Sequence, residues 1–96
     1  MPVVAVFQSP TLTKSTYEES VRRLTDGGAL RTPADWPVPG LLAHVAGQGP
    51  NGFRVVDVWQ SEEAFQKFGE KLMPVLKSLG IDGAPEVYPS HTLVTA

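Results

Sequence analysis

The sequence contains no cysteine, and this absence excludes several kinds of chemistry. Without thiols the chain can form no disulfide, use no thiol nucleophile and hold no iron–sulfur cluster or thiolate-bound metal. Positive charge is also scarce, because eight basic residues stand against ten acidic ones and the net charge is −2. We therefore expect no basic stripe of the kind that binds nucleic acid or an anionic membrane surface.

Long hydrophobic runs are missing as well. No apolar segment approaches the roughly 20 residues that cross a bilayer, and the first residues, Met1–Val4, lack the basic stretch that begins a signal peptide. We therefore expect a cytoplasmic protein. The chain has 96 residues, of which 42% are hydrophobic and 19% charged, so it is predicted to fold as one domain over residues 1–96.

Two helices are predicted from hydrophobic spacing. The first begins after Thr13 as its N-cap and ends at Asp26-Gly27-Gly28. Ser61 caps the second helix, which extends to Gly80, and Pro74 inside it predicts a kink or a restart. The apolar positions of the first helix recur at four-then-three spacing and are Tyr17, Val21 and Leu24.

Four segments rich in β-branched and aromatic residues are predicted to be strands, and they are Val3–Phe7, Leu41–Gly47, Phe53–Gln60 and Glu86–Val94. Pro50 and Asn51 lie at the centre of a turn that joins the second and third strands in a hairpin. The order βαββαβ is that of the ferredoxin-like class of α+β folds. It predicts a four-stranded antiparallel sheet with strand order 4-1-3-2 and both helices on one face.

The sheet face opposite the helices needs a cover. The first and third strands are apolar on both sides, and no further chain remains to shield the second side. A second copy of the chain would shield it. The sequence therefore predicts a homodimer.

The junction Phe53–Phe65 (FRVVDVWQSEEAF) carries a recognisable pattern. An acidic residue, a gap and an aromatic end a strand, and a Ser cap followed by Glu-Ala-Phe opens a helix. With Pro39–Gly40 before the second strand, this segment resembles the antibiotic-biosynthesis-monooxygenase-like group of the dimeric α/β-barrel proteins. The resemblance implies that two sheets pack face to face as a dimeric α/β barrel.

Members of this group include cofactor-independent oxygenases of polyketide and quinol substrates, haem-degrading oxygenases and proteins without assigned chemistry. Phe68 stands at the helix position that often holds His in quinol-type members or Trp in haem-degrading ones, and Val75–Ser78 replaces a His-rich stretch of the haem enzymes. Haem degradation is therefore not expected. The resemblance implies a cofactor-independent oxygenase of an aromatic or polyketide-like small molecule, and a cofactor-free cyclase acting on such a molecule is a related hypothesis.

His44 and Asp57 are the polar exceptions in the two hairpin strands. If Gly49 pairs with Gly52, opposite residue numbers add to 101, and His44 then faces Asp57 directly. A carboxylate that fixes one imidazole nitrogen leaves the other free as a general base, which suits the removal of a phenol or enol proton. The alternative is a structural hydrogen bond that satisfies two buried polar groups.

Aromatic residues surround this predicted pair. Phe53 and Trp59 share the strand face of Asp57 and would suit a flat apolar ligand, although Trp59 also suits a plain core. Trp36, in the proline-rich connection of residues 29–40, would close the pocket as a lid or else plug the core or the dimer seam. Two further aromatics, predicted to belong to the core or to line the pocket, are Tyr17 and Phe68.

Two hypotheses follow from the sequence. In the first, the protein is an enzyme with His44 as base and Asp57 as its orienting partner. In the second, it is a non-catalytic dimeric barrel that binds a small ligand or another protein. A metal site is not expected, because His91 is predicted on the strand at the opposite sheet edge, about 14 Å from His44 at about 4.8 Å per strand.

Overall fold

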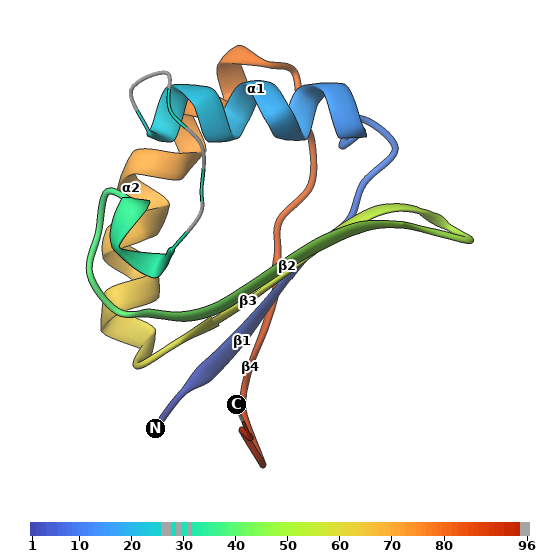
Figure 1. The fold of residues 1–96 in the computed structure, drawn as a ribbon. Coiled ribbons are helices and arrows are strands. Elements are labelled where there is room, and N and C mark those ends of the chain that lie inside the picture. Colours follow the sequence, from blue (N-terminus) through green and yellow to red (C-terminus); the bar gives the residue numbers. More distant parts are fainter. Residues whose placement is uncertain (26–27, 29, 31, 95–96) are drawn as a thin grey trace.

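The computed structural model describes residues 1–25, 28, 30 and 32–94, and over these it has the predicted ferredoxin-like α+β arrangement. The four strands form one antiparallel sheet in the order β2-β3-β1-β4, which confirms the predicted strand order. Both helices lie on the same face of this sheet (Figure 1). The elements are β1 (Val3–Phe7), α1 (Lys14–Leu24), the 3-10 turn η1 (Pro33–Asp35), β2 (Leu41–Gly49), β3 (Gly52–Trp59), α2 (Glu62–Ser78) and β4 (Glu86–Pro89).

The β2–β3 hairpin has the predicted register. Gly49 pairs with Gly52 across the turn, and His44 lies opposite Asp57. An irregularity between Leu41 and Ala43 shifts the pairing by one residue at the start of β2. Since the shift comes before His44, it leaves the His44–Asp57 pairing intact.

The last strand is shorter than predicted, since β4 ends at Pro89 and does not continue to Val94. Its partner β1 begins at Val3, which pairs with Pro89, so the residues that follow have almost no strand left to pair with. Proline also lacks the N–H that a ladder needs. One further bond, from the Ser90 N–H to the Pro2 carbonyl, closes the pairing at 2.9 Å.

Of the two outcomes predicted at Pro74, the restart does not occur, because α2 continues as one helix to Ser78. The proline removes one hydrogen-bond donor from the ladder, and the bonds on either side retain the helix. The hydroxyl of Ser61 accepts from the Ala64 N–H at 3.1 Å, as expected of an N-cap. In α1, Thr13 caps the first turn in the same way.

The core lies between the sheet and the two helices. At its centre the rings of Trp59 and Phe68 stack with centroids 4.8 Å apart, and both side chains are almost completely buried. Trp36 and Val38, which follow η1, are buried in the same cluster. A second, smaller cluster at the hairpin end consists of Leu12, Phe53 and Val55.

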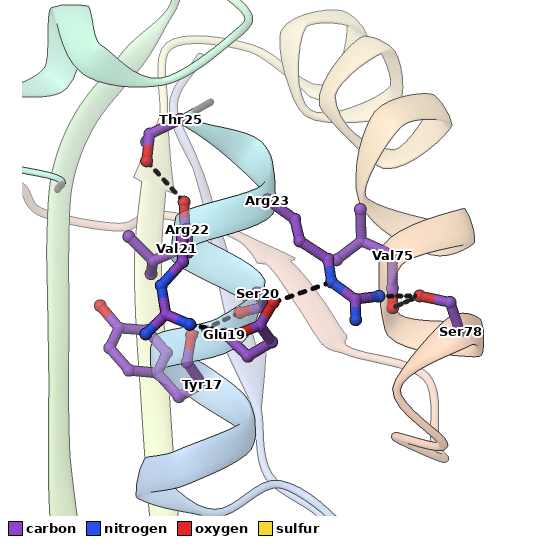
Figure 2. Close-up of polar contacts among 9 residues, drawn as sticks. All are labelled: Tyr17, Glu19, Ser20, Val21, Arg22, Arg23, Thr25, Val75 and Ser78. Atoms are coloured by element: carbon purple, nitrogen blue, oxygen red, sulfur yellow. Dashed lines mark hydrogen bonds and ion pairs between the residues drawn. The ribbon is translucent and has the colours of Figure 1, made fainter. Parts of the chain in front are cut away.

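Helices α1 and α2 are joined by a hydrogen bond near their C-terminal ends (Figure 2). Arg23 donates to the Ser78 hydroxyl at 2.6 Å, and that hydroxyl donates to the Val75 carbonyl at 2.8 Å. Arg23 also pairs with Glu19 within α1. Such exposed contacts add little stability, but they help to fix how α1 lies against α2.

Candidate active site

Three polar side chains from three elements form a continuous chain of hydrogen bonds on the helix-covered face of the sheet. Oδ1 of Asp57 lies 2.5 Å from Nδ1 of His44, and Nε2 of His44 lies 2.6 Å from the hydroxyl oxygen of Tyr17. Asp57 comes from β3, His44 from β2 and Tyr17 from α1. The predicted contact between His44 and Asp57 is therefore confirmed, and Tyr17 extends it.

Burial requires each group in this chain to have a hydrogen-bond partner, and the chemistry of the carboxylate determines which group donates. The side chain of Asp57 is only 2% exposed and that of His44 12% exposed, so each needs a partner. A carboxylate can only accept, so in the neutral ring the Nδ1–H of His44 donates to Asp57. Nε2 is then left with a lone pair, which accepts the O–H of Tyr17.

Tyr17 reaches this position because α1 presents its apolar side to the sheet. Figure 2 shows the ring extending from α1 away from α2, and its centroid lies 5.2 Å from that of Phe53 and 5.8 Å from that of His44. The sequence indicated Tyr17 as a core or pocket residue and did not predict its bond to His44. One signal was available, since a tyrosine on an apolar helix stripe needs a partner for its hydroxyl.

Burial raises the pKa of Tyr17 above the ordinary tyrosine value, and the negative charge of Asp57 raises it further. Both causes favour the neutral phenol over the phenolate. The hydroxyl therefore keeps its proton and donates it to His44.

This raised pKa predicts how stability responds to alkaline pH. The folded chain holds the Tyr17 proton at a pH at which the unfolded chain has lost it, so this contribution is complete below about pH 10 and is lost as pH rises through the folded pKa. We expect the free energy of unfolding to fall more steeply above about pH 10 in the wild type than in Tyr17→Phe. Urea unfolding at a series of pH values measures both slopes, and equal slopes would contradict the assignment.

The Asp57–His44–Tyr17 chain borders a cavity between the sheet and the helices. The cavity volume is about 50 Å³, enough for a few waters at about 10–15 Å³ each. Its remaining wall is largely apolar, and residues 82–85 of the loop after α2 form part of it. Apolar residues of the wall include Phe7, Leu12, Leu24, Val55, Leu72, Leu76 and Ile81.

The aromatic residues predicted to bind a ligand are not all at this cavity. Tyr17, Trp36 and Phe68 line it, whereas Phe53 and Trp59 do not. Trp59 is completely buried against Phe68, and Phe53 packs in the smaller cluster nearer the hairpin turn. They share the sheet face of Asp57 as predicted, but they lie too far along β3 in either direction.

Trp36 is both a core residue and part of the cavity wall. Its ring lies 5.5 Å from that of Phe68 and 5.5 Å from that of His44, and it is 7% exposed. Its indole N–H is buried without a hydrogen-bond partner among the described residues, as is that of Trp59. Trp36 therefore packs against the His44 ring at the cavity.

Potential metal ligands do not gather elsewhere in the described part of the chain, where no group of three His, Cys, Asp or Glu residues has the arrangement of a metal site. His91 was predicted on the last strand, but it lies beyond the end of β4 and is exposed.

In the part of the chain that the structure describes, no helix combines the length and apolarity needed to span a membrane.

The fold of this chain resembles that of proteins of known structure. No protein-family model matches the sequence, and no curated protein matches it significantly. A crystal structure of a mutant of SnoaB, a cofactor-independent oxygenase from Streptomyces nogalater, aligns over 99% of this chain and 98% of its own with a TM-score of 0.60 and 15% identity. The chain has the fold of the antibiotic-biosynthesis-monooxygenase-like proteins. The resemblance seen in the Phe53–Phe65 junction is thus confirmed at the level of the fold.

A second monooxygenase-like structure aligns over 99% of this chain and 91% of its own. It is a monooxygenase from the gene ActVA-Orf6 of Streptomyces coelicolor, solved with the ligand nanaomycin D, and it aligns with a TM-score of 0.48 and 21% identity. At these identities the likeness to the monooxygenase-like proteins lies in the fold. The chemistry of this member of the fold must therefore be derived from its own Tyr17, His44 and Asp57.

Proposed function

We propose that this protein is a cofactor-independent monooxygenase or cyclase that acts on a small aromatic or polyketide-type molecule with a phenol or enol group. The observation that carries the proposal is the buried Asp57–His44–Tyr17 chain at the edge of an apolar cavity. A polar relay inside apolar walls is the arrangement expected of a proton-transfer site.

The first chemical step is removal of the substrate O–H proton. The O–H bond breaks, its electron pair stays on oxygen, and the proton ends on Nε2 of His44. The negative charge of Asp57 then stabilises the imidazolium from the Nδ1 side. The substrate anion is electron-rich, which activates its ring carbon either for bond formation in a cyclisation or for reaction with dioxygen.

In the oxygenase case dioxygen supplies both the oxidising power and the inserted atom. Oxidation of a ring CH₂ to a carbonyl consumes one dioxygen, places one oxygen atom on carbon and releases the other as water. The substrate provides the electrons, so the balance needs no external reductant. The part of the protein is to hold the ring and accept the proton.

The cavity walls support a flat ligand. Phe68 and Trp36 lie nearly parallel, at 26°, and both face the cavity. At about 50 Å³ the cavity is smaller than the roughly 150 Å³ that holds benzene in a closed apolar site. Ligand binding therefore requires this partly open cavity to widen. The loop of residues 82–85 and the segment of residues 8–12 supply wall residues outside helices and strands.

One observation favours the non-catalytic alternative. Both ring nitrogens of His44 already have partners, so the chain satisfies itself without a ligand. A ligand-binding barrel without chemistry would need no more than this. Oxygen-electrode assays with a panel of hydroxylated naphthalenes and anthrones decide between the two. Oxygen uptake with a hydroxylated product supports the oxygenase, a cyclised product without uptake supports the cyclase, and binding without turnover supports the alternative.

We also propose that the outer sheet face is covered by a second copy of the chain. Pairing places Val4 and Tyr88 on this face together with Val45, and Val45 and Tyr88 are 65% and 43% exposed. An apolar sheet face of this kind is an expected dimer interface.

The oligomeric state gives a direct test of this cover. We expect sedimentation at micromolar concentration to give twice the 10.3 kDa chain mass, and Val45→Asp to give a monomer because a charge would be buried in the interface. Met73→Asp, on the exposed side of α2, is the matched control and should stay dimeric. A wild-type monomer would contradict the proposal.

A further inference from the structure

We propose that Tyr17 is the residue that contacts the ligand, that it selects a ligand by accepting a hydrogen bond from a hydroxyl group, and that it passes the hydroxyl proton on to His44. The relay half of this inference rests on the proposed function, whereas the selection half concerns binding alone. It assigns the direct contact to a helix residue and makes His44 the store of the proton.

Neither ring nitrogen of His44 is free to bind a ligand. Nδ1 is bonded to Asp57 at 2.5 Å and Nε2 to Tyr17 at 2.6 Å. The ring is also covered by Trp36, whose centroid lies 5.5 Å away. A ligand would have to displace the Tyr17 hydroxyl before it could reach Nε2.

The Tyr17 hydroxyl oxygen can accept a hydrogen bond from a ligand. A phenol has one proton and two lone pairs, and the proton of Tyr17 is donated to His44. The half-buried Tyr17 lines the cavity, so its oxygen presents only lone pairs to a ligand. Such an oxygen accepts from a phenol or enol O–H and gains nothing from a methyl ether, which has no proton to donate.

The proton then passes from the ligand to His44 through Tyr17. As the ligand O–H bond breaks, its proton forms a new O–H bond at Tyr17, and the former Tyr17 proton forms an N–H bond at Nε2 of His44. The electron pair of the broken bond stays on the ligand oxygen, which becomes a phenolate. Tyr17 ends as it began, and the charge pair remains between His44 and Asp57, the most buried of the three.

Other charged groups near the relay are few. From β2 and β3 the titratable groups that face Tyr17 are His44 and Asp57. Asp82, in the loop after α2, lines the same cavity. No lysine or arginine is among the residues that line the cavity. His44 is the group that is hydrogen-bonded to Tyr17, so it is the one placed to receive the Tyr17 proton.

The test uses 4-nitrophenol and 4-nitroanisole, which differ by the proton in question. We expect calorimetry to show that the wild type binds 4-nitrophenol about tenfold more tightly than 4-nitroanisole, since one hydrogen bond of about 1.4 kcal/mol gives that ratio. Tyr17→Phe should bind the two probes equally. Tyr88→Phe, which removes a hydroxyl on the opposite sheet face and outside the cavity wall, is the matched control and should keep the preference.

Absorbance tests the relay separately. Nitrophenolate absorbs at a longer wavelength than nitrophenol, so the bound probe reports its own ionisation. We expect a larger ionised fraction of bound probe than of free probe at the same pH in the wild type, and no such excess in Tyr17→Phe.

Labelling provides a readout that does not depend on a variant. The chain has two tyrosines, so with ¹³Cζ-labelled tyrosine, 4-nitrophenol should shift the Tyr17 signal and leave that of Tyr88 unchanged.

A preference and an ionisation that persist in Tyr17→Phe would overturn the inference, because His44 would then contact the ligand directly. So would a wild type that does not distinguish the probes, or a Tyr17 signal that does not move. Failure of this inference can be distinguished from failure of the proposed function. A wild type that ionises 4-nitrophenol but produces neither oxygenated nor cyclised products would refute the proposed enzyme and leave the role of Tyr17 standing.

Discussion

His44→Ala is expected to lower the turnover of the true substrate by a factor on the order of 10² to 10⁴, because a positioned proton acceptor contributes about that much. Asp57→Asn should lower it as well, since the neutral amide lacks the negative charge that stabilises an imidazolium. Initial rates under saturating dioxygen, with each variant well below its melting temperature, measure both effects.

Loss of stability must be separated from loss of catalysis in these variants. His44→Ala leaves the nearly buried carboxylate of Asp57 without its donor, which should cost about 1–3 kcal/mol of unfolding free energy. Val3→Ala is the matched control, because it removes a buried core side chain that does not line the cavity. It should lose comparable stability and keep full turnover. Equal rates in His44→Ala and the wild type would refute His44 as the proton acceptor.

Trp59→Ala is expected to destabilise the fold by about 3–5 kcal/mol, the usual cost of removing a large buried aromatic side chain. Trp59 is completely buried, and its ring stacks on Phe68 with centroids 4.8 Å apart. A domain of this size has only about 5–15 kcal/mol of stability, so the variant would be close to unfolding at room temperature.

Chemical unfolding followed by circular dichroism gives this loss directly. Trp59→Phe should cost less, because it retains part of the stack. Met73→Ala, at an apolar residue of α2 that is 48% exposed, is the control and should change stability little. A loss below about 1 kcal/mol in Trp59→Ala would show that this stack is not the centre of the core.

Much of the fold was predictable because its signals are local. The N-caps Thr13 and Ser61 and the helical spacing after them determine the two helices. A short turn fixes the hairpin register. The His44–Asp57 contact therefore followed from counting five residues away from the turn on each strand, starting at Gly49 and Gly52. The strand order followed from the order of the elements.

The features that sequence reasoning missed depend on how elements meet in space. The bond between Tyr17 and His44 joins residues 27 positions apart and depends on how deeply α1 docks on the sheet. The end of β4 depends on where β1 begins. Alternation along β3 gave the correct face for Trp59 but not its distance from the cavity, because residues on one strand face lie about 7 Å apart.

The tautomer of His44 tests the central claim most directly, because proton transfer from Tyr17 to His44 requires a proton on Nδ1 and a lone pair on Nε2. Long-range ¹⁵N–¹H correlation spectra of the uniformly labelled protein at neutral pH distinguish the two nitrogens, and the exposed His91 provides the comparison. We predict that His44 is protonated at Nδ1 and bare at Nε2, and that the Nε2 resonance moves in Tyr17→Phe as its donor is lost. A neutral ring protonated at Nε2, or an Nε2 resonance unchanged in Tyr17→Phe, would contradict the Asp57–His44–Tyr17 relay.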